Sequence, residues 1–313
     1  MAAPTLPLPG NTVIEEDLHL TKVTFWTRLR RHKLAIAGLI VLLLMVLAAA
    51  FAHQLAPFDP DAIDNVHWQG TPLPPCFQDA TLCGGHSLGT DEVGRDLLSR
   101  LLFGARISLT VGLFAVIMEI LIGATLGAIA GYYGGWVDYA LMRVTDVFLS
   151  IPLLPLLLVL TAIIAASSSH AALSFGVIVV IIGVLSWPPV ARLVRASFLS
   201  LREREFAEAA KAVGNNDGRI IFRHLLPNAV APIVVQATLD VANVIILEST
   251  LSFLGLGIQP PTASWGNMLA NAQSNLQTAW WAAVFPGICI LVTVLAINYI
   301  GDGLRDALDP NMN

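Results

Sequence analysis

Three acidic residues lie inside long apolar stretches of the sequence: Glu119, Asp240 and Glu248. An ionisable group at membrane depth is costly, so such residues usually face the interior of a helix bundle or a water-filled pathway. Glu119 and Asp240 could carry protons or another ion, which is the chemistry of a transporter driven by an ion gradient. For Glu248, pairing between helices and lining of a pathway are both open.

The sequence holds none of the common catalytic motifs. It lacks the G-x-x-x-x-G-K-[ST] loop that cradles phosphates, the H-E-x-x-H zinc-binding helix and the G-x-S-x-G nucleophile elbow. The glycine-rich run at residues 131–135 follows an apolar stretch and has no lysine to hold a phosphate, so it predicts a tight turn. We expect no catalytic residue and no metal in this chain. Energy for transport against a gradient would have to come from another protein.

Two cysteines, Cys76 and Cys83, lie seven positions apart in a long polar segment. A disulfide that closes a short loop is the prediction if this segment faces an oxidising compartment. Two unpaired thiols are the alternative. A metal or cluster site is a second alternative, because His67 and His86 are near in sequence. Cys289 falls in an apolar stretch, where a small packing role is expected.

The composition indicates an integral membrane protein. Hydrophobic residues make up 56% of the chain and charged residues only 12%, whereas soluble proteins carry about 25% charged residues. The mean hydropathy is +0.72. The net charge of −5 gives no sign of nucleic-acid binding.

Six stretches are long enough to cross a bilayer as helices, which takes about 20 mostly apolar residues. The predicted fold is therefore an all-α membrane protein with six transmembrane helices. The predicted spans are approximately residues 34–55, 107–130, 140–166, 173–190, 229–254 and 280–300.

The orientation follows from the lysines and arginines, because short loops rich in them stay in the cytoplasm. With the N-terminus inside, only Arg95, Arg100 and Arg106 of the 17 lysines and arginines fall outside. We therefore expect both termini in the cytoplasm. The expected regions are an N-terminal tail 1–33, a membrane domain 34–301 with an extracytoplasmic loop 57–106 and an inner loop 191–228, and a C-terminal tail 302–313.

A charged run precedes the second span. Asp91, Arg95, Asp96 and Arg100 lie close to helical spacing, so alternating charges could form ion pairs at a surface. Exposed pairs contribute only about 0–1 kcal/mol each. Positioning of a loop, docking of an external partner and a plain solvated helix face are all open for this run.

The inner loop predicts two short helices at an angle. Residues 201–213 are strong helix formers without Pro or Gly. Gly214 fits a helix stop, where a positive φ is cheap for glycine. After a turn at 215–218, residues 219–226 predict a second short helix that ends at Pro227.

One face of the first short helix is smooth. Phe206, Ala209, Ala210 and Val213 are spaced i, i+3, i+4 and i+7. Two of these four residues are alanines, which insert weakly into lipid and permit close approach of another protein. The pattern favours docking of a soluble partner over an amphipathic hairpin on lipid headgroups.

The same loop resembles the EAA loop of ATP-binding-cassette (ABC) importer permeases. The general form of that loop has an apolar residue where His224 stands. A His followed by an apolar residue and Leu-Pro-Asn is similar to the peptide and nickel importer branch. The residues that carry the resemblance are Glu208, Ala209, Ala210, Gly214, His224, Leu226 and Pro227.

Further segments agree with that branch. The Arg/Lys-rich entry to the first span and the Asp-Pro near the C-terminus resemble its C-type subunit. The resemblance covers about residues 25–310. The other matching segments are 88–100, 131–138, 142–146 and 252–266.

The resemblance implies a type I ABC importer permease with a cytoplasmic coupling helix in the bacterial inner membrane. The implied partners are a homologous B-type permease, two cytoplasmic ATPases that hold ATP and Mg²⁺, an extracytoplasmic substrate-binding protein and membrane lipid. Dipeptides or oligopeptides are the implied substrates, with nickel or another small solute as the alternative. A gradient-driven secondary transporter and a membrane scaffold without transport are the competing classes.

Overall fold

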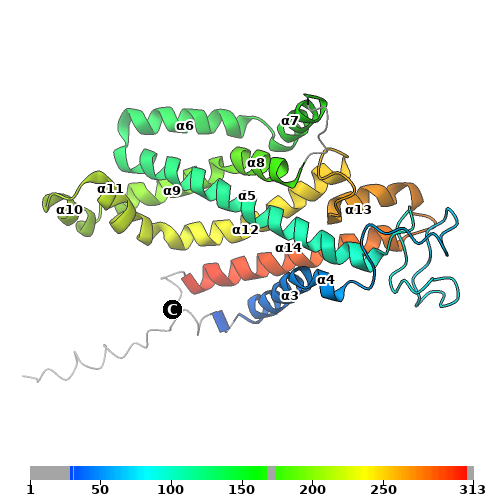
Figure 1. Cartoon of the computed structure of the whole chain (residues 1–313). Coiled ribbons are helices and arrows are strands. Elements are labelled where there is room, and N and C mark those ends of the chain that lie inside the picture. Colours follow the sequence, from blue (N-terminus) through cyan, green and yellow to red (C-terminus); the bar gives the residue numbers. More distant parts are fainter. Residues whose placement is uncertain (1–28, 31, 168–173, 309–313) are drawn as a thin grey trace, which may run out of the picture.

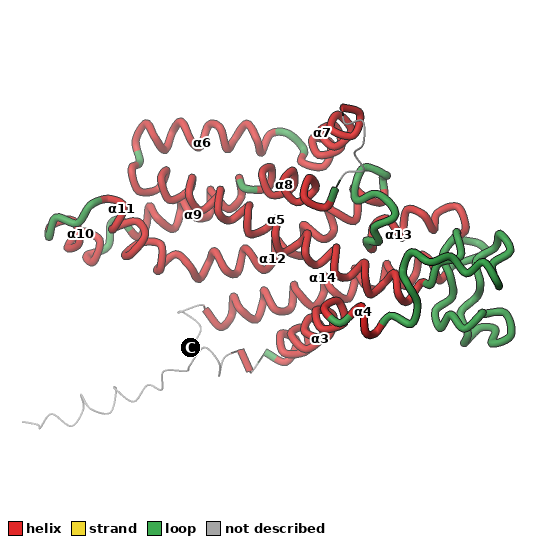
Figure 2. The backbone as a smooth tube through the Cα atoms, viewed as in Figure 1, coloured by secondary structure: helices red, strands yellow, loops and turns green. Residues whose placement is uncertain are grey.

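A computed structural model describes residues 29–30, 32–167 and 174–308 (Figure 1). In this part of the chain the regular elements are helices, and strand-like pairing is limited to two isolated bridges (Figure 2). Most of the expected N-terminal tail and the last five residues of the expected C-terminal tail lie outside the described residues.

Four helical segments are long and apolar enough to cross a membrane. One of them, residues 217–253, consists of three consecutive helices: α11 (Asp217–Arg219), the π-helix η2 (Ile220–Leu225) and α12 (Leu226–Phe253). The four segments are α3 (Lys33–Ala50), α5 (Leu97–Tyr133), Asp217–Phe253 and α14 (Trp281–Leu308).

Two further apolar segments are bent helix pairs. The chain turns by 82° between α6 (Gly135–Ser150) and α7 (Leu153–Ser167), and by 43° between α8 (Phe175–Ser186) and α9 (Pro188–Leu201). Proline has no N–H for the helix ladder, which accounts for the break at Pro188. Proline also disfavours a helical residue before it, and Ile151 before Pro152 is extended. Counting each pair as one span gives up to six.

The third and fourth expected spans therefore differ from the structure in shape. Residues 140–166 are not one helix, because α6 begins at Gly135 and the chain turns at Ile151. The second expected span also begins earlier, since α5 starts at Leu97 and takes ten residues from the expected loop 57–106.

The central helix α5 approaches α9 closely through glycines spaced four residues apart. A Cβ on Gly123 would lie 2.7 Å from Val190 Cβ, and one on Gly131 would lie 2.6 Å from Phe198 Cβ. Gly127 sits between them and faces the same helix. Lipid gives helices no hydrophobic reason to associate, so small residues that allow dense packing hold the pair together.

The two ends of the bundle are different. α10 (Glu205–Ala212) and α11 lie at one end, and the long loop before α5 lies at the other (Figure 1). We call these the α10 end and the loop end. α13 (Trp265–Ala272) and the short η3 (Gln273–Asn275) cover part of the loop end between α12 and α14.

Most of the charged run lies in a folded loop before α5, and its last residue, Arg100, lies in the first turn of α5. Asp91 Oδ2 pairs with Arg95 Nε at 2.7 Å and with Arg100 Nε at 3.4 Å. Asp96 caps α5, because its side chain accepts a 2.7 Å hydrogen bond from Ser99 N. Arg100 and Asp96 are each 1% exposed, which excludes the alternative of a plain solvated face.

Candidate functional site

The helix α10 is shorter than the sequence predicts. It spans Glu205–Ala212, while the expected helix began at residue 201. The difference arises because α9 extends to Leu201 and the chain then turns, so that Arg204 is extended. Gly214 has φ +82° and ends the helix as expected.

The predicted smooth face of α10 is partly buried within the protein and partly exposed. Ala207 and Ala210 are buried in an apolar cluster with Phe198. Ala209 and Val213 stay exposed, as does Phe206. Ala210 therefore packs within the chain and is not free for a partner.

The segment after α10 contradicts one expectation. The second short helix does not end at Pro227, because α11 and η2 run on into α12. Pro227 is the second residue of α12, directly after the π-helical turn of η2. His224 is half-buried in the π-helical turn, and its carbonyl accepts a 2.6 Å hydrogen bond from Asn228 Nδ2.

Polar contacts fix this segment to the end of α5. Tyr132 donates a 2.6 Å hydrogen bond to Asp217. Arg202 Nη1 donates to the carbonyls of Gly131 and Tyr132 at 3.1 and 3.3 Å. A cavity of about 450 Å³ lies beside these contacts, and Glu208 and Lys211 line it.

Exposed apolar side chains lie on α10, directly after it and on the neighbouring η2. Val213 is 83% exposed, and Phe206 and Phe222 also face outward. We call Phe206, Ala209, Val213 and Phe222 the α10 surface. An apolar surface on a firmly held segment is suited to docking of another protein. The sequence did not point to Phe222, because its outward position depends on how η2 packs.

Ion pairs link α6 to α9 near the same end. Arg195 donates to both oxygens of Asp138, one of them from Nη2 at 2.6 Å. Arg192 Nη2 lies 2.5 Å from Asp146 Oδ1. Bidentate arginine–carboxylate pairs fix geometry as well as adding energy.

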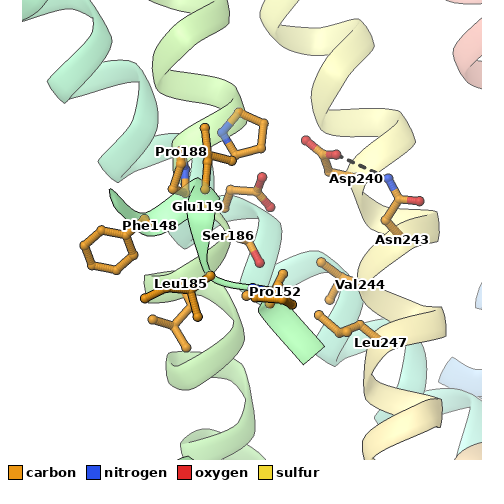
Figure 3. Close-up of a pocket in the computed structure, with 14 residues that line it drawn as sticks. Glu119, Phe148, Pro152, Leu185, Ser186, Pro188, Asp240, Asn243, Val244 and Leu247 are labelled. Carbon is orange, nitrogen blue, oxygen red and sulfur yellow. Dashed lines mark hydrogen bonds between the residues drawn. The ribbon is translucent and has the colours of Figure 1, made fainter. Parts of the chain in front are cut away.

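Glu119 and Asp240 meet at one cavity of about 410 Å³. Glu119 comes from α5 and Asp240 from the middle of α12. Their carboxyl groups point toward one another and interact (Figure 3). Asp240 also accepts hydrogen bonds from Gln236 Nε2 at 3.0 and 3.1 Å. We call this space the carboxylate cavity.

The helix breaks also line the carboxylate cavity. Ile151 and Pro152 come from the break between α6 and α7. Ser186, Pro188 and Pro189 come from the break between α8 and α9.

Glu248 lies apart from that cavity and is fully buried. Its carboxylate accepts hydrogen bonds from Ser252 Oγ at 2.8 Å and from Ser108 Oγ at 3.3 Å. Ser108 Oγ in turn accepts a 3.3 Å hydrogen bond from Trp265 N. Glu248 therefore ties α5, α12 and α13 together, which favours the interhelical alternative over the lining of a pathway.

At the loop end the sulfur atoms of Cys76 and Cys83 form a disulfide. His86 is buried next to it, with Nδ1 2.8 Å from Asp96 and Nε2 3.2 Å from Asp64. Its two ring nitrogens are thus taken up by carboxylates on either side.

Asp64 joins two parts of the long loop before α5, because it contacts both its own turn at residues 66–67 and His86. Burial by itself would raise the pKa of this carboxyl, but hydrogen bonds from His67, Val66 and His86 outweigh it and lower the pKa to about 2. The backbone N–H of His67 and its ring both contact Asp64, at 3.1 and 2.8 Å. The charged form of Asp64 is therefore part of the folded loop.

Comparison with known proteins adds a family to this geometry. Residues 123–313 match the family described as binding-protein-dependent transport system inner membrane component. Residues 23–75 match the N-terminal TM domain of oligopeptide transport permease C.

Relatives match over nearly the whole chain. A dipeptide transport system permease protein, DppC, of Alkalihalophilus pseudofirmus is 42% identical over 99% of this chain and 98% of its own. A glutathione transport system permease protein, GsiD, of Pectobacterium atrosepticum is 42% identical over 92% of this chain and 90% of its own.

Among solved structures, an inward-facing MetNI methionine ABC transporter chain is similar with a TM-score of 0.53. It is 19% identical and covers 67% of this chain and 96% of its own, so this likeness shows the fold alone. The chain therefore belongs to the family of binding-protein-dependent inner-membrane permeases of ABC importers and has their type I fold.

Proposed function

We propose that this chain is the C-type permease subunit of an ABC importer that moves dipeptides or oligopeptides across the bacterial inner membrane. The α10 surface carries the proposal, because it offers exposed apolar side chains on a segment that polar contacts hold to α5. Similarity to permeases named for dipeptides supports the substrate class. Nickel or another small solute is the alternative cargo.

The proposed assembly contains other chains. A homologous B-type permease would complete the pathway, and two cytoplasmic ATPases would bind ATP and Mg²⁺. An extracytoplasmic binding protein would deliver the substrate. This chain would perform no catalysis itself. The distribution of lysine and arginine supports a cytoplasmic α10 end and cytoplasmic termini, and a disulfide at the loop end suits an oxidising compartment.

The α10 segment would transmit movement and do no chemistry. Closure of the ATPases around ATP would push α10, and the contacts of Tyr132 and Arg202 would carry that push into α5. Because α5 packs closely on α9, both helices would shift together. Glu208 and Gly214 would shape the docking segment, and His224, Leu226 and Pro227 would shape the turn into α12.

The test changes one exposed residue of the α10 surface. Val213→Glu places a charge on an apolar contact, and we expect it to lower co-purification of the ATPases and substrate-stimulated ATP hydrolysis by at least about tenfold. Val66→Glu is the matched control, because Val66 is 81% exposed at the loop end. It should leave co-purification unchanged. Wild-type co-purification and hydrolysis in V213E would refute the docking role.

The facing carboxylates favour one competing function, a transporter driven by an ion gradient. That function predicts uptake by the purified chain alone under an imposed proton or sodium gradient without ATP. The proposed importer predicts uptake only when both permeases, the ATPases, the binding protein and ATP are present. Reconstitution with and without these partners decides between them.

A further inference from the structure

We propose that Glu119 and Asp240 form a site for the primary ammonium group of the substrate on its way through the membrane. The inference rests on the proposed import of peptides and deepens it, because it names the part of the substrate that this chain would bind.

The burial and the surroundings of Glu119 support this assignment. This residue lies on α5, deep in the bundle, and its side chain is 3% exposed and directed into the carboxylate cavity (Figure 3). Its polar partner among the described residues is another acid, Asp240. The ion pairs found in the described part of the chain all involve other carboxylates.

Asp240 is held in place for such a role. Gln236 donates to both of its oxygens at 3.0 and 3.1 Å, and Asn243 approaches one of them at 3.5 Å. These neutral amides orient the carboxylate and leave its charge uncompensated. Two carboxylates that face each other in a buried space repel, so a cation or a shared proton between them is strongly favoured.

The helix breaks add acceptors around the same space. Pro189 has no N–H to donate to the carbonyl of Leu185, four residues earlier at the end of α8, and Leu185 lines the cavity. The α6 terminus at Ser150 also ends beside the cavity, and helix C-termini carry partial negative charge. Discontinuous helices near the middle of the membrane are a usual place for transport sites.

The size and walls of the cavity suit part of a small organic molecule. Its volume of about 410 Å³ lies within the ordinary range for ligand pockets. Phe148, Leu185, Val244 and Leu247 supply apolar walls next to the two acids. An ammonium group has three N–H donors and no acceptor, so it can bond both carboxylates at once.

Glu248 is a buried carboxylate with a structural role, and its hydrogen-bond donors differ from those of Glu119. Serine hydroxyls from α5 and α12 donate to it. Glu119 has no comparable set of donors in the described residues, which is why we assign binding to Glu119 and not to Glu248.

The test compares two probes on the complete complex of both permeases and both ATPases, without the binding protein. Dialanine carries a free ammonium group, while N-acetyl-dialanine replaces it with a neutral amide. We expect the wild-type complex in nanodiscs to bind radiolabelled dialanine at least about tenfold more tightly than N-acetyl-dialanine, because hydrogen bonds between charged groups are stronger than those of a neutral amide.

The variants then locate the preference. Glu119→Gln and Asp240→Asn should each weaken dialanine binding by at least about tenfold and leave N-acetyl-dialanine unchanged. Glu92→Gln, in the loop before α5 and far from the cavity in the sequence, is the matched control and should keep the preference. Assembly of every variant is checked by co-elution with the partner chains.

Several outcomes would overturn the site. Equal binding of both probes by the wild type does so without any variant, so misfolding of a variant cannot rescue it. A preference that persists in both variants also overturns it. If E119Q loses uptake of both probes equally and wild-type uptake depends on a proton gradient, Glu119 and Asp240 would bind a proton and not the ammonium group.

The proposed import is measured separately on the same preparation. If the wild-type complex with its binding protein takes up no dialanine when ATP is supplied, the proposed function fails. If the wild-type complex takes up dialanine but the E119Q and D240N variants bind dialanine as tightly as the wild type, only the ammonium site fails.

Discussion

The hydroxyl of Tyr132 donates a 2.6 Å hydrogen bond to the carboxylate of Asp217, and this contact joins positions 85 residues apart in the chain. Tyr132 lies at the end of α5, and Asp217 begins the helical run that continues as α12. The helical run that follows α10 is therefore tied directly to the central helix.

Removing that contact should uncouple movement of α10 from α5. We expect Tyr132→Phe to lower the number of substrate molecules transported per ATP hydrolysed, with a loss of only about 0.5–1.5 kcal/mol in the free energy of unfolding. Tyr133→Phe is the matched control, because the neighbouring hydroxyl makes no hydrogen bond within the described residues. Equal transport per ATP in both variants would show that the contact carries no coupling.

Gly214 tests the geometry of the α10 terminus. Its φ of +82° is strained for other residues, yet an added Cβ would meet no atom within 4 Å. Gly214→Ala should therefore lower the free energy of unfolding by about 1–2 kcal/mol through backbone strain alone, and should reduce ATPase stimulation. Thermal unfolding of the purified complex measures the first effect.

Gly218 provides the control for that change. It lies in α11, has no positive φ and also meets no atom within 4 Å. Gly218→Ala should leave stability unchanged or raise it by up to about 1 kcal/mol, because alanine favours a helix. If G214A and G218A behave alike, the αL ending of α10 is not important.

The close approach of α5 to α9 can be tested in the same way. A Cβ on Gly127 would lie 2.9 Å from Val194 Cβ and still closer to the carbonyl oxygen of Ala191. Gly127→Ala should force the helices apart and cost about 1–3 kcal/mol. Gly176→Ala on α8 meets nothing within 4 Å and should be neutral. A neutral G127A would mean that the helices can separate without loss.

Hydropathy could predict the existence of the spans but not their shape. Runs such as that of α3 and residues 281–300 of α14 are apolar on nearly every side, which is typical of helices in a lipid environment. The 82° turn before Pro152 depends on what α6 and α7 pack against, so proline alone could not distinguish a mild kink from a break.

The candidate sites divide in the same manner. The position of the α10 segment could be predicted because its local sequence is polar between apolar runs. The exposure of α10 side chains could not, since burial of Ala210 depends on Phe198 of α9. Likewise Glu119 and Glu248 both lie in apolar runs of the sequence, and the hydroxyls of Ser108 and Ser252 that bond Glu248 separate their roles.

The folded loop should respond to pH through Asp64. Its pKa is lowered from an ordinary 3.8 to about 2, so the folded state favours the charged carboxylate. A lowered pKa gives stability that is fully present above about pH 4 and is lost as the pH falls toward 2. We expect the unfolding temperature of the wild type to exceed that of Asp64→Asn at pH 5, and the difference to shrink between about pH 4 and pH 2.

Asp79→Asn is the control for this prediction. The pKa of Asp79 is also lowered, mainly by the hydroxyl and backbone N–H of Thr81, but this carboxyl is exposed and contacts only its own turn. Asp64 instead contacts His86, which is buried against Asp96 at the start of α5. The pH-dependent difference should therefore be larger for D64N than for D79N. Equal differences would show that Asp64 stabilises only its local turn and not the junction of the loop with α5.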